Sequence, residues 1–172
     1  MKKTMASSAL EKVEKGSRVF VDATIFIYHF TGASLDCRRF LESCERGSLT
    51  GFTSVIAVAE VAHRLMMIEA VTKGLISPGN PARKLREKPS IVKELFVYQK
   101  QIELIPLMGI TVLPLDLEIP RLANDLRHQY GLLVNDSLLA ASAAREGIQD
   151  IASADPDFER VEELRLFRPA DL

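Results

Sequence analysis

The chain of 172 residues contains no tryptophan and only two cysteines, Cys37 and Cys44. Two cysteines are too few for a zinc site of four thiolates or for the disulfide framework of a small secreted domain. Their spacing of seven residues corresponds to two helical turns, a rise of about 10 Å, whereas a disulfide needs Cα atoms less than about 7 Å apart. We therefore expect both thiols to stay reduced and to lie in the core.

The chain also lacks a long hydrophobic run, an apolar leader and an excess of either charge. No apolar stretch approaches the ~18 residues of a membrane-spanning helix, and the segment after Met1 is polar, unlike a signal peptide. The 22 Lys and Arg residues nearly balance the 23 Asp and Glu residues, so no global positive field marks a nucleic-acid binder, although a local patch is compatible with this balance. We expect one domain, no membrane association and a cytoplasmic location.

Strand-like and helix-like segments alternate along the chain, which favours an α/β fold. The segments expected to be strands are 18–22, 49–52, 109–113, 148–152 and 164–167, and those expected to be helices are 23–30, 34–46, 55–71, 91–105, 117–129 and 136–146. Such alternation typically forms a parallel sheet covered on both faces. We predict a single three-layer domain with a central, mostly parallel sheet flanked by helices.

Two stretches differ from this pattern. Residues 1–16 are expected to form a polar N-terminal extension, with a short helix over Ser8–Glu14, and residues 17–172 the domain itself. Residues 72–90 are interrupted by Gly and Pro and are rich in Lys and Arg. Because Gly and Pro break regular elements, we expect an exposed basic excursion with a short helix there.

Three carboxylates are each the only charge within an apolar run: Asp22 in residues 19–27, Glu60 in 55–62 and Asp136 in 132–140. Burying an ionised carboxylate alone is costly, so such groups are normally paired or bound to a metal. Arg64 lies one helical turn from Glu60 and could pair with it, but the runs around Asp22 and Asp136 contain no cation. A shared divalent cation would satisfy all three acids, and hard oxygen ligands suit Mg²⁺ or Mn²⁺.

Two more carboxylates, Asp155 and Asp157, follow the expected strand 148–152. Asp22 likewise ends the expected strand 18–22. Functional sites of open parallel sheets lie at the carboxyl ends of the strands. The sequence therefore predicts that these acids emerge at one edge of the sheet.

Each acid taken alone also has an ordinary structural explanation. Asp136 could cap its helix, and Glu60 could face solvent on an amphipathic helix. Asp22 could end its strand as a turn residue, and Asp155 or Asp157 could form an Asx turn. The set favours a shared function, because each acid stands at an element boundary or within an apolar helix of one small domain.

Four segments, in this order, resemble the PIN domain of VapC-type toxin ribonucleases. They are Val-Phe-Val-Asp-Ala-Thr-Ile-Phe (19–26), Thr-Ser-Val-Ile-Ala-Val-Ala-Glu-Val-Ala-His-Arg-Leu (53–65), Leu-Val-Asn-Asp-Ser-Leu-Leu-Ala-Ala-Ser-Ala (133–143) and Ile-Ala-Ser-Ala-Asp-Pro-Asp-Phe (151–158). The resemblance covers nearly the whole chain from Arg18. It implies a PIN-like fold and a Mg²⁺- or Mn²⁺-dependent endoribonuclease, the toxin of a toxin–antitoxin pair, that hydrolyses RNA phosphodiester bonds with a metal-activated water.

The resemblance also implies roles for particular residues. The implied catalytic and metal-binding acids are Asp22, Glu60, Asp136 and Asp155, with Asp157 as a further metal ligand, and the supporting residues are Thr24, Ser153 and Asn135. Because an acidic site repels RNA, cations that hold the RNA backbone are also expected; the candidates are Arg83, Lys84, Arg86, Lys88, Arg38 and Arg39. The implied partners are an RNA substrate, an antitoxin protein and a second copy of the chain.

Two other functions stay open at this point. One is a catalytically silent PIN-like module that binds nucleic acid or acts as a scaffold, against which the complete set of acids argues. The other is a phosphatase with Asp22 as nucleophile, because Asp-x-Thr is similar to part of the Asp-x-Asp-x-Thr/Val motif of haloacid dehalogenases. Thr24 stands where that motif has its second Asp, which makes the phosphatase the weaker alternative.

Overall fold

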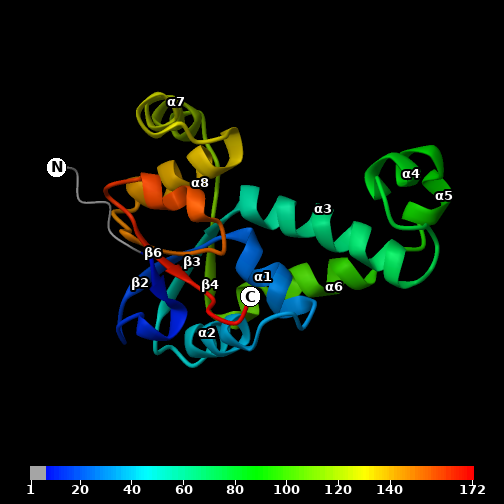
Figure 1. Ribbon diagram of the computed structural model, residues 1–172, viewed down its shortest axis with the longest axis horizontal. Helices are drawn as coiled ribbons and strands as arrows, with labels where there is room; N and C mark the ends of the chain where they lie inside the picture. Colours follow the sequence, from blue (N-terminus) through cyan, green and yellow to red (C-terminus); the bar gives the residue numbers. More distant parts are fainter. Residues whose placement is uncertain (1–6) are drawn as a thin grey trace.

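A six-stranded parallel sheet forms the centre of the molecule (Figure 1). The computed structural model describes residues 7–172, and its strands are β1 (Ser8–Ala9), β2 (Arg18–Val21), β3 (Thr50–Ser54), β4 (Ile110–Leu113), β5 (Asp150–Ala152) and β6 (Arg165–Arg168). They lie in the order β1-β6-β5-β2-β3-β4, and every neighbouring pair is parallel. The predicted α/β domain with a central, mostly parallel sheet is therefore confirmed.

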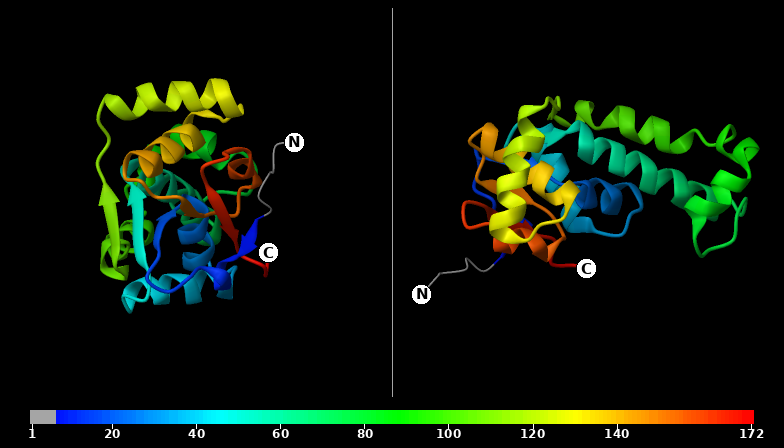
Figure 2. Two further views of the ribbon diagram at one scale, coloured as in Figure 1. Left: turned by 90° about the vertical axis from the view of Figure 1, so that its left-hand side faces the viewer. Right: turned by 90° about the horizontal axis from the view of Figure 1, so that it is seen from above.

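Helices flank this sheet. They are α1 (Ala23–Phe30), α2 (Leu35–Glu45), α3 (Val55–Thr72), α4 (Pro81–Glu87), α5 (Pro89–Val92), α6 (Val97–Leu104), α7 (Glu118–Tyr130) and α8 (Val134–Arg145), with the 3-10 helices η1 (Leu10–Lys12), η2 (Pro106–Met108) and η3 (Pro156–Arg160). Helices α7 and α8 lie on one side of the molecule and α2 on the opposite side, with the strands between them (Figures 1 and 2). This arrangement is the flanked sheet that the alternation of segments predicts.

Strand β2 is one of the two central strands and positions the first acid. Its residues Val19, Phe20 and Val21 have no exposed surface, and the strand pairs with β3 on one side and β5 on the other. A parallel strand covered on both faces must be apolar throughout, which explains the run Val-Phe-Val. The next residue, Asp22, therefore emerges at the carboxyl edge of the sheet.

Two sequence predictions about local structure are wrong. Ser8–Glu14 does not form one helix: Ser8–Ala9 is strand β1, which pairs with β6, and η1 follows it. The N-terminal extension predicted over residues 1–16 is thus in part a component of the sheet, and its residues 1–6 lie outside the described residues. The helix predicted over 91–105 is divided into α5 and α6, because residues 93–96 leave the helical path.

The two cysteines confirm the expectation of a reduced core. Cys37 and Cys44 lie on α2, are buried, and are both free. Burial raises the pKa of Cys37 to about 11 and that of Cys44 to about 12. Both side chains are consequently uncharged core groups at neutral pH.

Within residues 7–172, no helix is long and apolar enough to cross a membrane.

The basic excursion belongs to a helical arm, which we define as residues 66–104. Helices α3 and α6 run side by side away from the sheet, and α4 and α5 lie at the far end (Figure 1 and the right view of Figure 2). The arm has a small core of its own, formed by Ala70, Ile76, Leu85 and Leu95. The excursion predicted over residues 72–90 therefore folds around these apolar side chains.

Glu69 of α3 fastens the returning helix α6 to the arm. Its carboxylate accepts the backbone N–H groups of Phe96 at 3.2 Å and of Tyr98 at 3.0 Å, and Lys73 forms an ion pair with it at 2.5 Å. Burial alone would raise the pKa of Glu69, but the hydrogen bonds from Lys73, Tyr98, Val97 and Phe96 outweigh it and hold that pKa below its usual range. Glu69 thus caps the first turn of α6 from another helix.

We predict that Glu69→Ala lowers the free energy of unfolding by about 2 kcal/mol, because it leaves partly buried N–H groups at the start of α6 without their charged acceptor. Urea unfolding at pH 7.5 measures this loss, and Glu103→Ala on the exposed side of α6 is the control. Since the pKa of folded Glu69 is lowered, its contribution is full above the unfolded pKa and disappears as the pH falls through the folded value. A variant as stable as the Glu103→Ala control would contradict this role.

Candidate metal centre

Asp22 is the most buried of the predicted site acids, with 4% of its surface exposed. It follows β2 and is the N-cap of α1, where its side chain accepts the backbone N–H of Thr24. Burial raises the pKa of Asp22, and hydrogen bonds from Ser153 and Thr24 oppose that effect. The carboxylate is therefore held at the sheet edge in an environment that disfavours its charge.

The hydroxyl groups of Thr24 and Ser153 fix the orientation of Asp22. Each donates to Oδ2 of Asp22 at 2.6 Å, so neither hydroxyl occupies Oδ1. Ser153 reaches Asp22 because Val21 of β2 and Ala152 of β5 are partners in the sheet, and the chain continues from both at the same edge. Both residues, predicted to support the site, thus contact its first acid directly.

The same hydroxyls position the turn that carries Asp155. The backbone N–H of Asp155 donates to Oγ of Ser153, and the N–H of Ala154 donates to Oγ1 of Thr24, both at 3.0 Å. Asp155 then caps η3 by accepting the N–H of Asp157 at 2.8 Å. The Asx turn is thus real, and it fixes Asp155 beside Asp22 through one hydrogen-bond network.

Asp157 differs from the other acids because it already has a cationic partner. Arg160 forms an ion pair with Oδ1 of Asp157 at 2.8 Å and donates to the backbone carbonyl of Gly131 at 3.3 Å. A metal ion would compete with this guanidinium for Asp157. Arg160 was not predicted from the sequence, although its spacing of three residues from Asp157 on a short helix could have indicated it.

Glu60 points to the site from the second turn of α3. It is partly exposed, and burial together with repulsion by Asp22 raises its pKa, while Arg64 and a hydrogen bond from Asn135 lower it. Asn135 lies on α8, so this bond joins α3 to the helix that carries Asp136. The interpretation of Glu60 as a purely solvent-facing residue is therefore wrong.

Asp136 is the third residue of α8 and does not cap it. The N-cap position is occupied by Leu133, which offers no side-chain bond. The pKa of Asp136 is raised to about 6, first by burial and then by repulsion from four other carboxylates, Asp155, Asp22, Asp157 and Glu60. Asp136 therefore stands within the electric field of the other predicted ligands.

The predicted site acids are close enough to act on one another electrostatically, but their side chains do not surround a single point. Within the described part of the chain, no group of three or more His, Cys, Asp and Glu side chains is already spaced to hold one ion. The donor chemistry nevertheless fits a divalent cation, because carboxylate oxygens are the ligands that such hard ions prefer. Asp22, Glu60, Asp136 and Asp155 are the residues that would hold it.

Most of the predicted RNA-binding cations lie away from these acids. Arg83, Lys84, Arg86 and Lys88 belong to α4 and its end, at the tip of the arm. Arg83 pairs with Glu87, and Lys84 donates to Ser77 and Pro78. On α2, Arg38 pairs with Glu42, whereas Arg39 is exposed.

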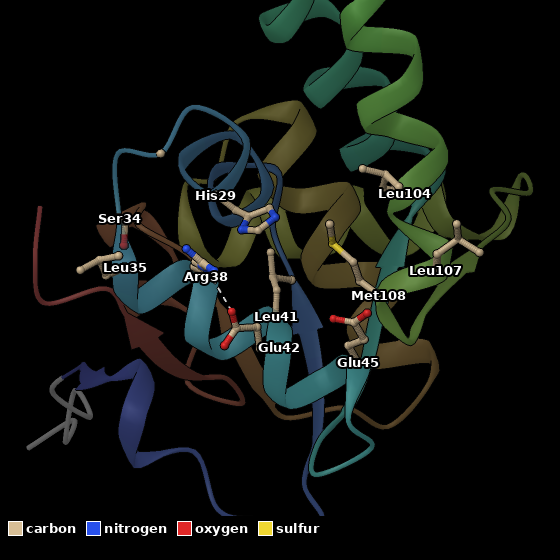
Figure 3. Close-up of a pocket in the computed structure, with 11 residues that line it drawn as sticks. His29, Ser34, Leu35, Arg38, Leu41, Glu42, Glu45, Leu104, Leu107 and Met108 are labelled. Atoms are coloured by element: carbon tan, nitrogen blue, oxygen red, sulfur yellow. Dashed lines mark hydrogen bonds and ion pairs between the residues drawn. The ribbon is translucent and has the colours of Figure 1, made fainter.

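A cleft with a volume of about 520 Å³ lies between α1, α2 and η2, and none of the predicted acids lines it. In Figure 3, His29 and the Arg38–Glu42 ion pair face Leu104 and Met108 across this cleft. The metal centre and this cleft are therefore different parts of the surface.

Comparisons with known proteins find a family model and a relative that each match most of the chain. The family model of the PIN domain matches residues 19–164. The protein named Ribonuclease VapC2 from Methanocaldococcus jannaschii is 29% identical over 150 residues, which cover 87% of this chain and 93% of that protein.

Solved structures resemble the fold at low sequence identity. The structure of VapBC2 from Rickettsia felis bound to a promoter DNA fragment has a TM-score of 0.56 at 18% identity and covers 88% of this chain and 98% of that one. A toxin–antitoxin complex from Klebsiella pneumoniae has a TM-score of 0.53 at 18% identity and covers 85% of this chain and 94% of that one. At this identity the likeness concerns the fold.

We predict that Asp136→Asn stabilises the metal-free protein at pH 7.5 by about 1 kcal/mol after allowance for solvent screening, or about 2–4 °C in Tm. The folded pKa of about 6 lies above the unfolded value. The folded state therefore binds more protons between these values, and stability falls as the pH rises through that window. The variant removes this penalty.

Thermal melts with EDTA and with Mn²⁺ test this prediction. Mn²⁺ should raise the Tm of the wild type much more than that of Asp136→Asn. The exposed Asp125→Asn substitution on α7 should leave both melts unchanged. An Asp136→Asn protein that is destabilised without metal, or that gains as much from Mn²⁺ as the wild type, would show that the acids do not share a charge-dependent site.

Proposed function

Because the chain belongs to the PIN domain family, we propose that it is a metal-dependent endoribonuclease that hydrolyses RNA phosphodiester bonds, and that it is the toxin of a toxin–antitoxin pair. PIN-domain ribonucleases are metal-dependent in general, and a relative that matches most of the chain is named a ribonuclease. The oxygen-only ligand set favours Mg²⁺ or Mn²⁺. The two free thiols support a reducing, cytoplasmic setting.

The observation that carries this proposal is the mutual repulsion of the acids. The pKa of Asp136 is raised to about 6 by burial and by four carboxylates that come from α1, α3 and the turn after β5. Carboxylates whose pKa is raised by burial and by neighbouring like charges, as for Asp136 and Glu60, are a recognised sign of a functional site. An arrangement of this kind is stabilised when a cation is bound and destabilised without one.

Some residues of this chain would bind the metal ion, and others would orient these ligands. A divalent cation, when bound, would supply an activated water and neutralise charge on the scissile phosphate. Thr24 and Ser153 hold Asp22 in one orientation, and Asn135 holds Glu60. Such orienting hydrogen bonds keep ligands in place. Asp155 is fixed by its turn, so four ligands are positioned from four different segments.

A protein partner is supported by the surface around the site. Leu133 and Val134 precede Asp136 and are 72% and 59% exposed. Exposed apolar side chains of this size beside a site favour a covering partner. We assign this role to an antitoxin, since one solved relative is a toxin–antitoxin complex, and we assign to the chain a homodimeric state. The exposed cations Arg86 and Lys88 at the arm tip are candidates for further contacts with RNA.

The two alternative functions receive less support. Asp22 is buried, caps α1 and is bound by two hydroxyl groups, which does not suit a nucleophile that must reach a phosphate. A silent scaffold would have no need of four acids that repel one another in its fold.

We predict that Asp22→Asn reduces RNA cleavage by roughly 100-fold or more, as expected when a preorganised charged group is removed. Cleavage of RNA by the purified protein with Mn²⁺, followed by sequencing of the new 5′ ends, measures the loss. Asp125→Asn is the matched control, and circular dichroism checks that Asp22→Asn folds. Cleavage at the wild-type rate by Asp22→Asn would exclude Asp22 as a ligand, and a wild-type protein that cleaves no RNA with Mn²⁺ would exclude the function itself.

A further inference from the structure

Arg64 is an exposed cation on α3 that lies one helical turn beyond Glu60. Residues four apart on a helix share one face, so the guanidinium lies beside the Glu60 carboxylate and acts on it electrostatically. Within residues 7–172, however, no hydrogen bond or ion pair joins Arg64 to another side chain. A charged group at the edge of the acidic site is thus left without a direct partner.

The absence of an Arg64–Glu60 ion pair is informative because comparable pairs do form elsewhere. The i,i+4 pairs Arg38–Glu42, Glu69–Lys73 and Arg83–Glu87 close at 3.0, 2.5 and 2.8 Å. Glu60 and Arg64 have the more favourable order, with the acid nearer the helix N-terminus, yet they do not close. Arg64 and Asn135 of α8 both lower the pKa of Glu60. Arg64 thus acts on Glu60 through its charge and not through a closed ion pair.

The other arginines near the site are already engaged. Arg160 pairs with Asp157 and with the carbonyl of Gly131. Arg127 donates to Oγ of Ser137 at 2.9 Å, next to Asp136, and also bonds Asn124. Among the described residues 7–172, Arg64 is therefore the arginine beside these acids that is available for an external ligand.

A guanidinium beside Glu60 has opposite effects on the metal ion and on the RNA phosphate that a metal-dependent nuclease binds. It repels a divalent cation held by Glu60 and attracts a phosphate, which it can bind with two parallel hydrogen bonds. We infer that Arg64 binds a backbone phosphate of the RNA strand beside the scissile bond. The inference rests on the proposed ribonuclease function, and it makes Arg64 a substrate-binding residue that offsets the repulsion between RNA and the acids.

The experiment measures binding of a fluorescent single-stranded RNA to the non-cleaving Asp22→Asn protein with Mn²⁺, by anisotropy over a series of salt concentrations. Adding Arg64→Gln should weaken RNA binding about tenfold and reduce the slope of log K against log salt by about 0.7, the value for one phosphate contact on a single strand. Arg64→Lys should keep most of the slope but lose affinity, since a lysine binds phosphate as a point charge.

The affinity for Mn²⁺, measured by calorimetry without RNA on the wild type and on Arg64→Gln, provides a second readout. It should rise about twofold to threefold in Arg64→Gln, because a repelling charge is lost. The exposed Arg121→Gln substitution on α7 should change neither quantity. A variant with tighter Mn²⁺ binding but unaltered RNA affinity and salt slope would overturn the inference, because Arg64 would then act on Glu60 alone.

The two possible failures are distinguishable. If the wild type cleaves RNA and Arg64→Gln binds it normally, only the role of Arg64 is wrong. If the wild type neither cleaves nor binds RNA, the ribonuclease function fails and the role of Arg64 fails with it.

Discussion

Repulsion between carboxylates at the carboxyl edge of the sheet is the interaction on which the rest of the structure depends. Asp22 is buried beside two hydroxyl groups, and the pKa of Asp136 is raised to about 6 by burial and by repulsion from the other acids. This arrangement costs folding free energy in the absence of a cation. The fold tolerates the cost because an apolar parallel sheet and the helices around it supply the stability, while the acids stand where the strands end.

The site is assembled from segments far apart in the chain, and each is positioned by an ordinary structural rule. A buried strand ends at Val21, a capped helix begins at Ala23, and a turn follows β5. The pairing of Val21 with Ala152 brings Ser153 to Asp22. Helices α3 and α8 contact each other, so Glu60 and Asp136 act on each other electrostatically. Local rules thus place each acid, and a few hydrogen bonds between segments place them relative to one another.

The sequence predicted most strands and most helices because those signals are local, and the acids were singled out by a local signal as well. An isolated charge in an apolar run is visible without a structure, as for Asp22 and Asp136. The division of the helix over residues 91–105 was not predictable, since it depends on Glu69 accepting N–H groups 27 and 29 residues away. Strand β1 was missed for the same reason, because two residues become a strand only through their pairing with β6. The Asp157–Arg160 ion pair, and the lack of an ion pair between Glu60 and Arg64 among the described residues, could likewise be recognised only from the positions of the side chains.

Helix α3 links the site to the arm, since Glu60 lies near its start and Glu69 near its end. Thr72 follows Glu60 by twelve positions on α3, a rise of about 18 Å, so the cations of the arm tip lie well away from the acids. The most direct test of a shared cation is anomalous X-ray diffraction from crystals grown with Mn²⁺ at pH 7.5. The account predicts a manganese peak bonded to oxygens of Asp22, Glu60 and Asp136. Manganese bound only elsewhere, with these carboxylates apart and unliganded, would contradict it.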